Sequence, residues 1–66
     1  MINIKINGLK HSVAEDSLYN ILNKLNYIQK WSAIELNGEI LQQTQLKQTN
    51  VQQGDSIEVI TPVGGG

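Results

Sequence analysis

Hydrophobic and polar residues alternate strictly at the start of the chain. Isoleucine occupies positions 2, 4 and 6, and polar residues lie between them. This period of two predicts a strand with one buried face. Asn7-Gly8 then favours a two-residue hairpin turn, because both residues tolerate the positive φ that a type I′ turn requires. We expect the return strand at Leu9 to about Val13, with His11 opposite Ile4 on the hydrophobic face.

The next hydrophobic positions follow a helical period. Asp16 or Ser17 is the expected N-cap, and Glu15 and Asp16 lie where carboxylates favour the positive end of a helix dipole. The hydrophobic residues after the cap form one stripe about 120° wide on a helix. They are Leu18, Ile21, Leu22, Leu25 and Ile28. We expect the helix to pack on one side against a sheet. The residues expected to face water are Asn20, Asn23, Lys24, Asn26 and Tyr27.

A second hairpin is predicted further along the chain. Ser32–Leu36 and Glu39–Leu41 have the composition of strands on either side of the turn Asn37-Gly38. A strict two-residue turn sets Ile34 against the last residue of the return strand and leaves Ile40 on the other face. A bulge is the alternative register.

The final third of the chain contains a polar connection and one more strand. Residues 42–50 predict a loop or a short helical turn held by Leu46, and residues 52–55 predict a turn. The last strand is expected from Ser56 to about Val63. Its alternation places Ile57 and Val59 on one face and Glu58 and Ile60 on the other.

The order hairpin, helix, short hairpin, loop and strand predicts an α+β domain in which one helix covers one face of a mixed sheet of four to five strands. Only the helix and the long connection are long enough to link parallel strands. This is a β-grasp arrangement, with Asn3, Lys5, Glu58 and Ile60 on the uncovered face. We expect one domain, residues 1–63, followed by a flexible glycine tail, residues 64–66.

Composition limits the classes of function. The 66 residues have a formal net charge of −1, and their five lysines are scattered along the chain. This argues against nucleic-acid binding. No stretch approaches the roughly 20 apolar residues of a membrane span, and the N-terminus lacks a secretory signal pattern. We expect a soluble cytoplasmic monomer, or a stromal one if the protein belongs to a plastid, that binds neither membrane nor nucleic acid.

Few side chains offer reactive chemistry. The sequence has no cysteine, so a disulfide framework, a thiolate metal site and a thiol nucleophile are excluded. Ser12 points to the face of its strand opposite His11, the one histidine, so the two cannot act as nucleophile and base. We expect His11 to be a partly buried sheet residue and Trp31 to pack at the rim of the core, with a partner anchor as the alternative role of Trp31. No catalytic residue, metal site or bound cofactor is predicted within the chain.

The sequence ends in Thr-Pro-Val-Gly-Gly-Gly. A frayed terminus or an expression remnant would explain three glycines seen alone. Here they closely follow a predicted strand and Pro62, and the extended segment from Pro62 to Gly66 spans at most ~18 Å. Glycine also lets a backbone enter a channel that any side chain would block. The reactive group that this geometry presents is the α-carboxylate of Gly66, which an enzyme would have to activate, for example by adenylation.

Three short motifs combine with this order of elements and this length: "LNG" at 36–38, "QGD" at 53–55 and the terminal "VGGG". With them, the whole chain resembles the ThiS-type sulfur carrier proteins of thiamin biosynthesis. Members of that family end in Gly-Gly, and Gly65-Gly66 occupy this place, with Gly64 as an extra glycine. The resemblance implies that Gly66 is adenylated and then converted to a thiocarboxylate, which donates sulfur for the thiazole ring.

The same resemblance implies that the chain is a protein cosubstrate and not an enzyme. An adenylyltransferase of the ubiquitin-activating type would use ATP and magnesium, a cysteine desulfurase or related donor would supply sulfur, and thiazole synthase would accept it. Gly64, Gly65 and Gly66 would enter the active sites of these partners. Ile60 and Val63 are the candidate partner contacts on the body, and an ordinary exposed residue is the alternative for Ile60.

Three other functions stay open on the sequence. Molybdopterin synthase small subunits share the fold and the Gly-Gly end, although they are longer. Ubiquitin-like protein modifiers usually carry a basic residue just before the diglycine, and here Val63 precedes the glycine run. An inert binding module with an incidental tail is the third.

Overall fold

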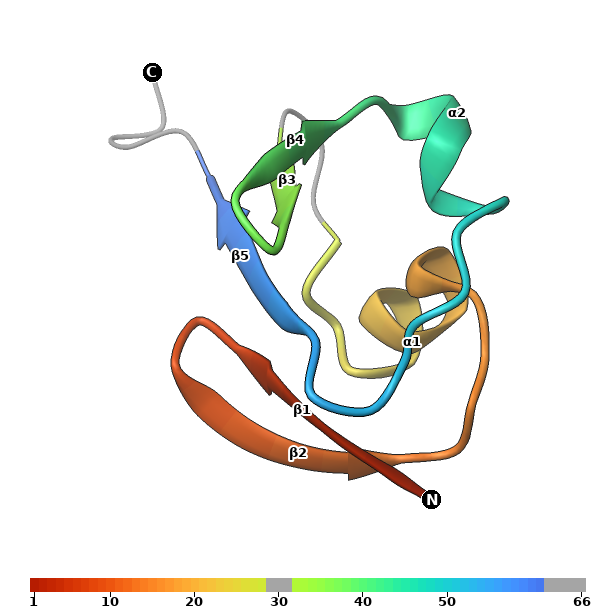
Figure 1. The fold of residues 1–66 in the computed structure, drawn as a ribbon. Coiled ribbons are helices and arrows are strands. Elements are labelled where there is room, and N and C mark those ends of the chain that lie inside the picture. The colour runs from red at the N-terminus through yellow and green to blue at the C-terminus, as the bar shows by residue number, and fades with distance from the viewer. Residues whose placement is uncertain (29–31, 62–66) are drawn as a thin grey trace.

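The computed structural model describes residues 1–28 and 32–61. Its strands are β1 (Ile2–Ile6), β2 (Leu9–Val13), β3 (Ala33–Leu36), β4 (Glu39–Leu41) and β5 (Ser56–Ile60). They form one mixed sheet in the order β2-β1-β5-β3-β4 (Figure 1). The last strand in the chain, β5, is central in the sheet, parallel to β1 and antiparallel to β3. This topology confirms the predicted α+β, β-grasp fold.

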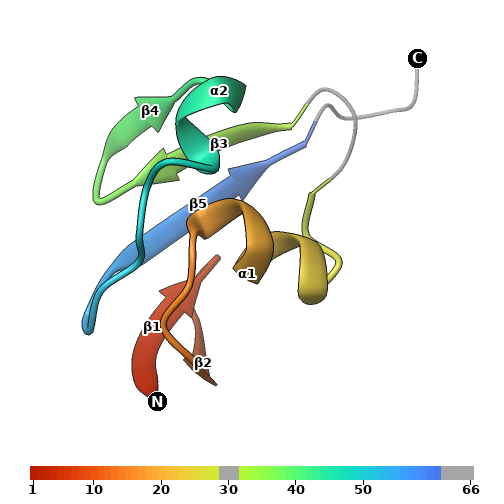
Figure 2. The same cartoon turned by 90° about the vertical axis from the view of Figure 1, so that its right-hand side faces the viewer.

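Two helices lie on one side of the sheet (Figure 2). The predicted helix is α1 (Leu18–Lys24), and α2 (Gln43–Leu46) is the short helical turn expected around Leu46. The Leu46 side chain is fully buried, so it anchors α2 to the body. The Leu18 N–H donates a hydrogen bond to the Thr49 carbonyl oxygen at 2.7 Å, which ties the start of α1 to the segment after α2.

Both predicted Asn-Gly turns are present. Asn7 and Asn37 have φ values of 52° and 50°, in the left-handed region that asparagine tolerates better than most residues. The first hairpin has the predicted register throughout. In the second, Ile34 pairs with Leu41 as a strict two-residue turn requires, so the alternative with a bulge is wrong.

The helix α1 is shorter than predicted. Ser17 is its N-cap, and the Ser17 Oγ accepts a hydrogen bond from the Asn20 N–H at 3.1 Å. The helix ends at Lys24, so the prediction that its stripe continues to Ile28 is wrong. The cause is Asn26, whose φ of 62° turns the chain out of the helix.

The end of α1 is a Schellman motif. The Asn26 N–H donates to the Asn23 carbonyl oxygen at 3.1 Å, and the Tyr27 N–H donates to the Leu22 carbonyl oxygen at 2.8 Å. These bonds satisfy two of the carbonyl groups that a helix end leaves without partners. Ile28 still packs against the core from outside the helix. Tyr27 also packs against it, so the prediction that this side chain faces water is wrong.

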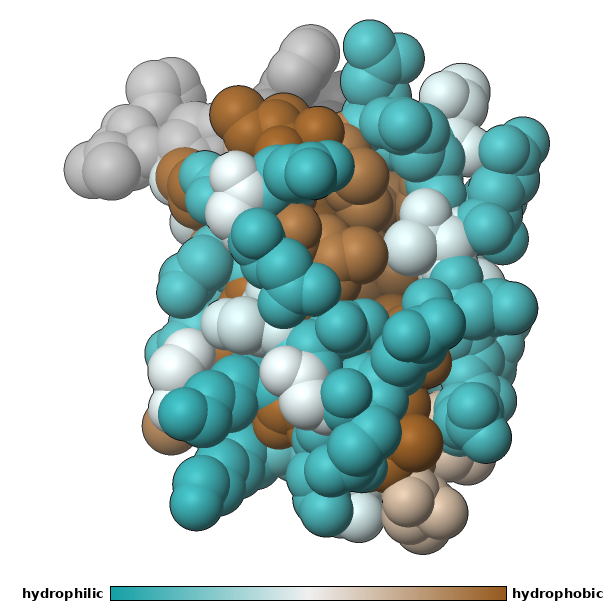
Figure 3. All heavy atoms as spheres, viewed as in Figure 1, coloured by the Kyte–Doolittle hydropathy of each residue, from teal (hydrophilic) through white to brown (hydrophobic). Residues whose placement is uncertain are grey.

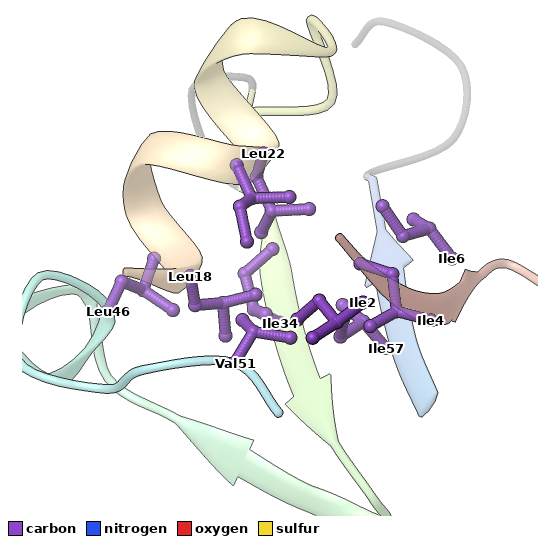
Figure 4. Close-up of a cluster of buried hydrophobic side chains, with 10 residues drawn as sticks. Ile2, Ile4, Ile6, Leu18, Leu22, Ile34, Leu46, Val51 and Ile57 are labelled. Carbon is purple, nitrogen blue, oxygen red and sulfur yellow. The ribbon is translucent and has the colours of Figure 1, made fainter. Parts of the chain in front are cut away.

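A hydrophobic core fills the space between the sheet and the helices (Figure 4). Its buried members are Ile2, Ile4, Ile6, Leu18, Ile21, Leu22, Ile34, Leu46, Val51 and Ile57. We call the other side of the sheet, away from the helices, the open face. The side chains predicted there are all exposed: Asn3, Lys5, Glu58 and Ile60. Among the described residues, no helix is long and apolar enough to cross a membrane.

Candidate functional site at the end of the last strand

The central strand leads to the predicted reactive tail. β5 ends at Ile60, and the exposed Thr61 lies outside it, so the strand is shorter than predicted. Ile60 lies on the open face opposite Ala33 of β3, with 50% of its surface exposed. The other predicted site residues lie outside the described residues, and so does Trp31. These site residues are Val63, Gly64, Gly65 and Gly66.

The first Asn-Gly turn holds β5 through a side chain. The Asn7 Oδ1 accepts a hydrogen bond from the Val59 N–H at 2.7 Å, and the Asn7 N–H donates to the Ile57 carbonyl oxygen at 2.9 Å. The paired residues of β1 and β5 end with Ile6 and Ile57. Asn7 therefore continues this pairing beyond β1 and holds β5 in the sheet up to the residue before Ile60.

The second Asn-Gly turn binds the turn that precedes β5. The Asn37 Nδ2 donates to Asp55 Oδ1 at 3.0 Å, and the Asn37 Oδ1 accepts from the Ser56 N–H at 2.9 Å. The other carboxylate oxygen of Asp55 accepts from the Gln52 N–H at 2.8 Å, across a turn in which Gly54 has a φ of 86°. The "LNG" and "QGD" motifs are therefore two halves of one hydrogen-bond network that fixes the start of β5.

The sequence predictions missed the positioning roles of Asn7 and Asn37. A type I′ turn explains both residues by their tolerance of positive φ, and it says nothing about the side-chain amide. Aspartate or glycine would serve the same turn position. The repetition of asparagine in both turns was the available signal that the amide itself has a partner.

His11 has a structural partner in Tyr27. The His11 Nε2 lies 3.2 Å from the Tyr27 hydroxyl oxygen, and the two rings meet edge to face with centroids 5.8 Å apart. The His11 side chain is partly buried and Ser12 is exposed, as predicted. Among the described residues, no three His, Cys, Asp or Glu side chains gather where they could hold a metal ion.

The Asp16 carboxylate stabilises the start of α1. Its Oδ1 accepts hydrogen bonds from the Asn20 side-chain amide at 3.0 Å and from the Ser17 N–H at 2.7 Å. These two bonds, that of Asn20 first, lower the pKa of Asp16 from its ordinary value of 3.8, because they favour the charged form. The Lys24 Nζ lies 3.6 Å from the other carboxylate oxygen and acts in the same direction. Asp16 therefore has a role in the helix and not in a reactive site.

Comparison with known proteins identifies the family of this chain. The model of the ThiS family matches residues 4–66. The chain belongs to the ThiS family. "Uncharacterized protein ycf40" of Porphyra purpurea is 38% identical to it over 66 residues, and the protein of the same name from Pyropia yezoensis is 39% identical. Each alignment covers 98% of this chain and 93% of the relative.

Solved structures of ThiS show the same fold. The crystal structure of the thiamine biosynthesis protein ThiS from Geobacter metallireducens matches with a TM-score of 0.82 and 30% identity, over 98% of this chain and 100% of that one. The solution NMR structure of a thiamine biosynthesis protein from the same organism matches with a TM-score of 0.77 and 30% identity, over 98% and 88% of the two chains. The resemblance to ThiS found in the sequence is thus confirmed.

Proposed function

We propose that this ThiS-family chain is a sulfur carrier protein of thiamine biosynthesis and that Gly66 carries the sulfur. The observation that carries the proposal is the family match through residue 66, on a fold whose central strand leads to that end. Three groups with acid-base chemistry in the described residues, His11, Asp16 and Asp55, are engaged in contacts that hold the fold. This favours a body that positions a reactive end for enzymes to act on.

In the proposed cycle, the Gly66 carboxylate exchanges one oxygen for sulfur. A carboxylate oxygen attacks the α-phosphorus of ATP, pyrophosphate leaves, and an acyl adenylate forms. Sulfur at the oxidation level of sulfide then attacks the acyl carbon, and the bond from that carbon to the AMP oxygen breaks as the carbon–sulfur bond forms. AMP leaves and a thiocarboxylate remains. ATP and its magnesium ion belong to the activating partner in this proposal, where the metal neutralises phosphate charge.

Three partners act on the tail in this cycle. An adenylyltransferase of the ubiquitin-activating type forms the adenylate, and thiazole synthase accepts the sulfur from the thiocarboxylate. A cysteine desulfurase or related donor provides the sulfur as a persulfide, and a thiol reductant releases it at the level of sulfide while being oxidised to a disulfide. Gly64, Gly65 and Gly66 enter their active sites, because glycine passes through channels that a Cβ atom would block. Ile60 and Val63 contact the partners from the body.

Holding β5 in place is useful for such a carrier. The side chain of Asn7 and the network of Asn37 and Asp55 anchor β5 at its middle and at its start. The position from which the tail departs is therefore set by the sheet. A partner that binds the open face then meets the tail at a defined place, which lowers the entropy cost of bringing the carboxylate to its active site.

Intact-mass spectrometry tests the proposed function. The full chain is incubated with the adenylyltransferase, Mg-ATP and sulfide, and we expect its mass to rise by the difference between sulfur and oxygen. The matched control is a chain shortened by Gly65 and Gly66, which keeps the body and is expected to gain nothing. An unchanged mass of the full chain would overturn the proposal.

The same reaction mixture separates the related functions. The thiocarboxylate is next offered to thiazole synthase, and formation of the thiazole is expected. Transfer to a molybdopterin synthase large subunit and not to thiazole synthase would instead place the chain in molybdopterin synthesis. Conjugates of this chain with other proteins, seen as a series of higher masses, would identify a protein modifier.

A further inference from the structure

We propose that one half of the open face docks a cationic element of the adenylyltransferase, flanked by hydrophobic side chains of that enzyme. We call this half the acidic-apolar patch, and it consists of Ala33, Glu35, Ile40, Glu58 and Ile60. The inference rests on the proposed function, because it names the surface by which the activating enzyme recognises the body of the carrier. The expected chemistry on the enzyme is an arginine or a lysine among apolar residues.

Two carboxylates lie directly opposite each other in the patch. Glu35 of β3 and Glu58 of β5 are partners in the antiparallel register. The Cβ atoms of such partners are about 5 Å apart, and like charges at these positions destabilise a sheet. Both side chains belong to central strands of the sheet. The pair therefore lowers the stability of the isolated domain at the middle of the open face.

The acidic pair has no counter-ion among the described residues. The ion pair found in residues 1–28 and 32–61 joins the start of α1 to its last turn, away from the open face. Lys5 and Lys10 share the open face, but they are partners of each other across β1 and β2. Lys5 is also the partner of Ser56, not of Glu58, on β5. The face is therefore segregated, with positive charge over β2 and β1 and negative charge over β5 and β3.

Hydrophobic side chains lie beside the two carboxylates. Ile40 is the partner of Glu35 on β4 and is 71% exposed, and Ile60 follows Glu58 on the same side of β5. In the view of Figure 3, hydrophobic surface is visible around β4, whereas hydrophilic surface dominates around β1 and β2. An arginine suits such a patch, because its guanidinium can bind carboxylates while its aliphatic stem packs on apolar side chains.

The distance along the chain favours an enzyme that acts on the tail as the occupant. Six residues lead from Ile60 to Gly66, and an extended segment of this length spans at most about 20 Å. An enzyme that holds the Gly66 carboxylate in its active site is thereby held next to the patch. Of the enzymes in the proposed cycle, the adenylyltransferase is the one that meets the carrier with a free carboxylate, so we assign the patch to it.

Under this proposal, substitution of either glutamate changes two measurable quantities in opposite directions, the stability of the free domain and its affinity for the enzyme. Replacing Glu58 by glutamine removes one negative charge, keeps the shape of the side chain and relieves the repulsion with Glu35. The isolated domain then becomes more stable, while its complex with the enzyme becomes weaker. If Glu58 had a purely structural role, its replacement would lower the stability of the free domain. If it had no role, its replacement would leave the stability and the affinity for the enzyme unchanged.

The experiment measures affinity for the adenylyltransferase and the melting temperature of the free carrier, for the full chain and its variants. We expect E58Q and E35Q each to weaken binding about tenfold at low salt, to flatten its salt dependence and to raise the melting temperature. The matched control is E39Q. Glu39 is an exposed carboxylate on β4 that neighbours Ile40 in sequence and points to the other face of the sheet. We expect E39Q to bind like the unaltered chain.

Three outcomes would overturn the docking proposal: equal affinities for E58Q and E39Q, a lower melting temperature of E58Q and E35Q, or weaker binding to thiazole synthase alone. The thiocarboxylate assay on the unaltered chain keeps this failure separate from failure of the proposed function. A chain that gains sulfur normally while E58Q binds like E39Q is a sulfur carrier that docks through another surface.

Discussion

Successive residues of β5 alternate between the covered face and the open face of the sheet, and the two faces constrain them differently. Ile57 is fully buried under the helices, and Val59 packs against the same core. Glu58 and Ile60 alternate with them on the open face, where both are exposed. On the covered face a residue is constrained by volume, because the interior is close-packed. On the open face volume is not limiting, and under the docking proposal a residue there is constrained by the partner's surface. Stability and docking are then expected to be separable within one five-residue strand.

Removing volume from the covered face should give the largest effect. Ile57→Ala leaves a cavity at the contact between β5, β1 and β3, and we expect it to lower the free energy of unfolding by about 2–5 kcal/mol. A domain of this size has little stability to lose, so much of the protein would be unfolded. Urea denaturation followed by circular dichroism measures this change.

The control for that substitution lies on the open face. Ile40→Ala removes the same atoms from a side chain that is already mostly exposed, and we expect a change of no more than about 0.5 kcal/mol. Similar losses for Ile57→Ala and Ile40→Ala would show that the two faces do not differ as described.

Asn37 belongs to neither face and tests how β5 is held. Asn37→Ala removes the bonds to Asp55 and Ser56 and places alanine at a φ of 50°. We expect a loss of about 3–4 kcal/mol, from two hydrogen bonds of about 1 kcal/mol each and about 1–2 kcal/mol for a left-handed conformation that alanine disfavours. Asn37→Gly is the matched variant, because it loses the same bonds and keeps the turn. If Asn37→Gly were as stable as the unaltered chain, the side-chain amide of Asn37 would not stabilise the protein as proposed.

The sequence predicted the elements whose signal repeats. Alternating isoleucines placed β1, and the first Asn-Gly pair predicted its hairpin register, because a two-residue turn leaves little freedom. For the second hairpin the sequence left two registers open, a strict two-residue turn and a bulge. Leu46 indicated a segment held to the core at that residue, either a loop or a short helical turn. Each of these predictions depended on residues close together in the chain.

The predictions that failed depended on single conformations or on distant partners. The stripe to Ile28 kept its spacing, but one left-handed residue, Asn26, ended the helix, and periodicity carries no information on that φ. Tyr27 was predicted to face water, but it meets His11, sixteen residues earlier. The bond between Asn7 and Val59 spans 52 residues, and no local pattern reveals such a contact.

A polar substitution at Ile60 tests docking with little effect on folding. Ile60→Ser removes an exposed hydrophobic side chain without adding charge beside Glu58, and we expect a stability change of about 1 kcal/mol or less. If partners contact this residue, kcat/KM for adenylation falls about tenfold, which corresponds to about 1.4 kcal/mol of lost transition-state binding. The measurement is pyrophosphate release at varied carrier concentration.

Leu9→Ser provides the comparison for Ile60→Ser. Leu9 is also an exposed hydrophobic residue, but it lies on the edge strand β2 and pairs with Ile6, whose side chain points to the covered side. We expect unaltered adenylation kinetics for this variant. A tenfold loss in both variants would indicate a general effect of exposed hydrophobic surface and not a contact at the end of β5.

The smallest effect concerns the polar start of α1, in the layer that covers the core. The pKa of Asp16 is lower in the folded protein than its ordinary value of 3.8, first through the Asn20 amide and then through the Ser17 N–H. Folding therefore favours the carboxylate, and the stability that it contributes is present above this value and is lost as the pH falls through the folded pKa. We expect Asp16→Asn to reduce the dependence of unfolding free energy on pH below about pH 4, as urea titrations at pH 7 and pH 3 would show. Glu15→Gln removes the neighbouring charge but leaves these bonds in place, so an equal flattening in that variant would attribute the effect to net charge and not to the contacts of Asp16.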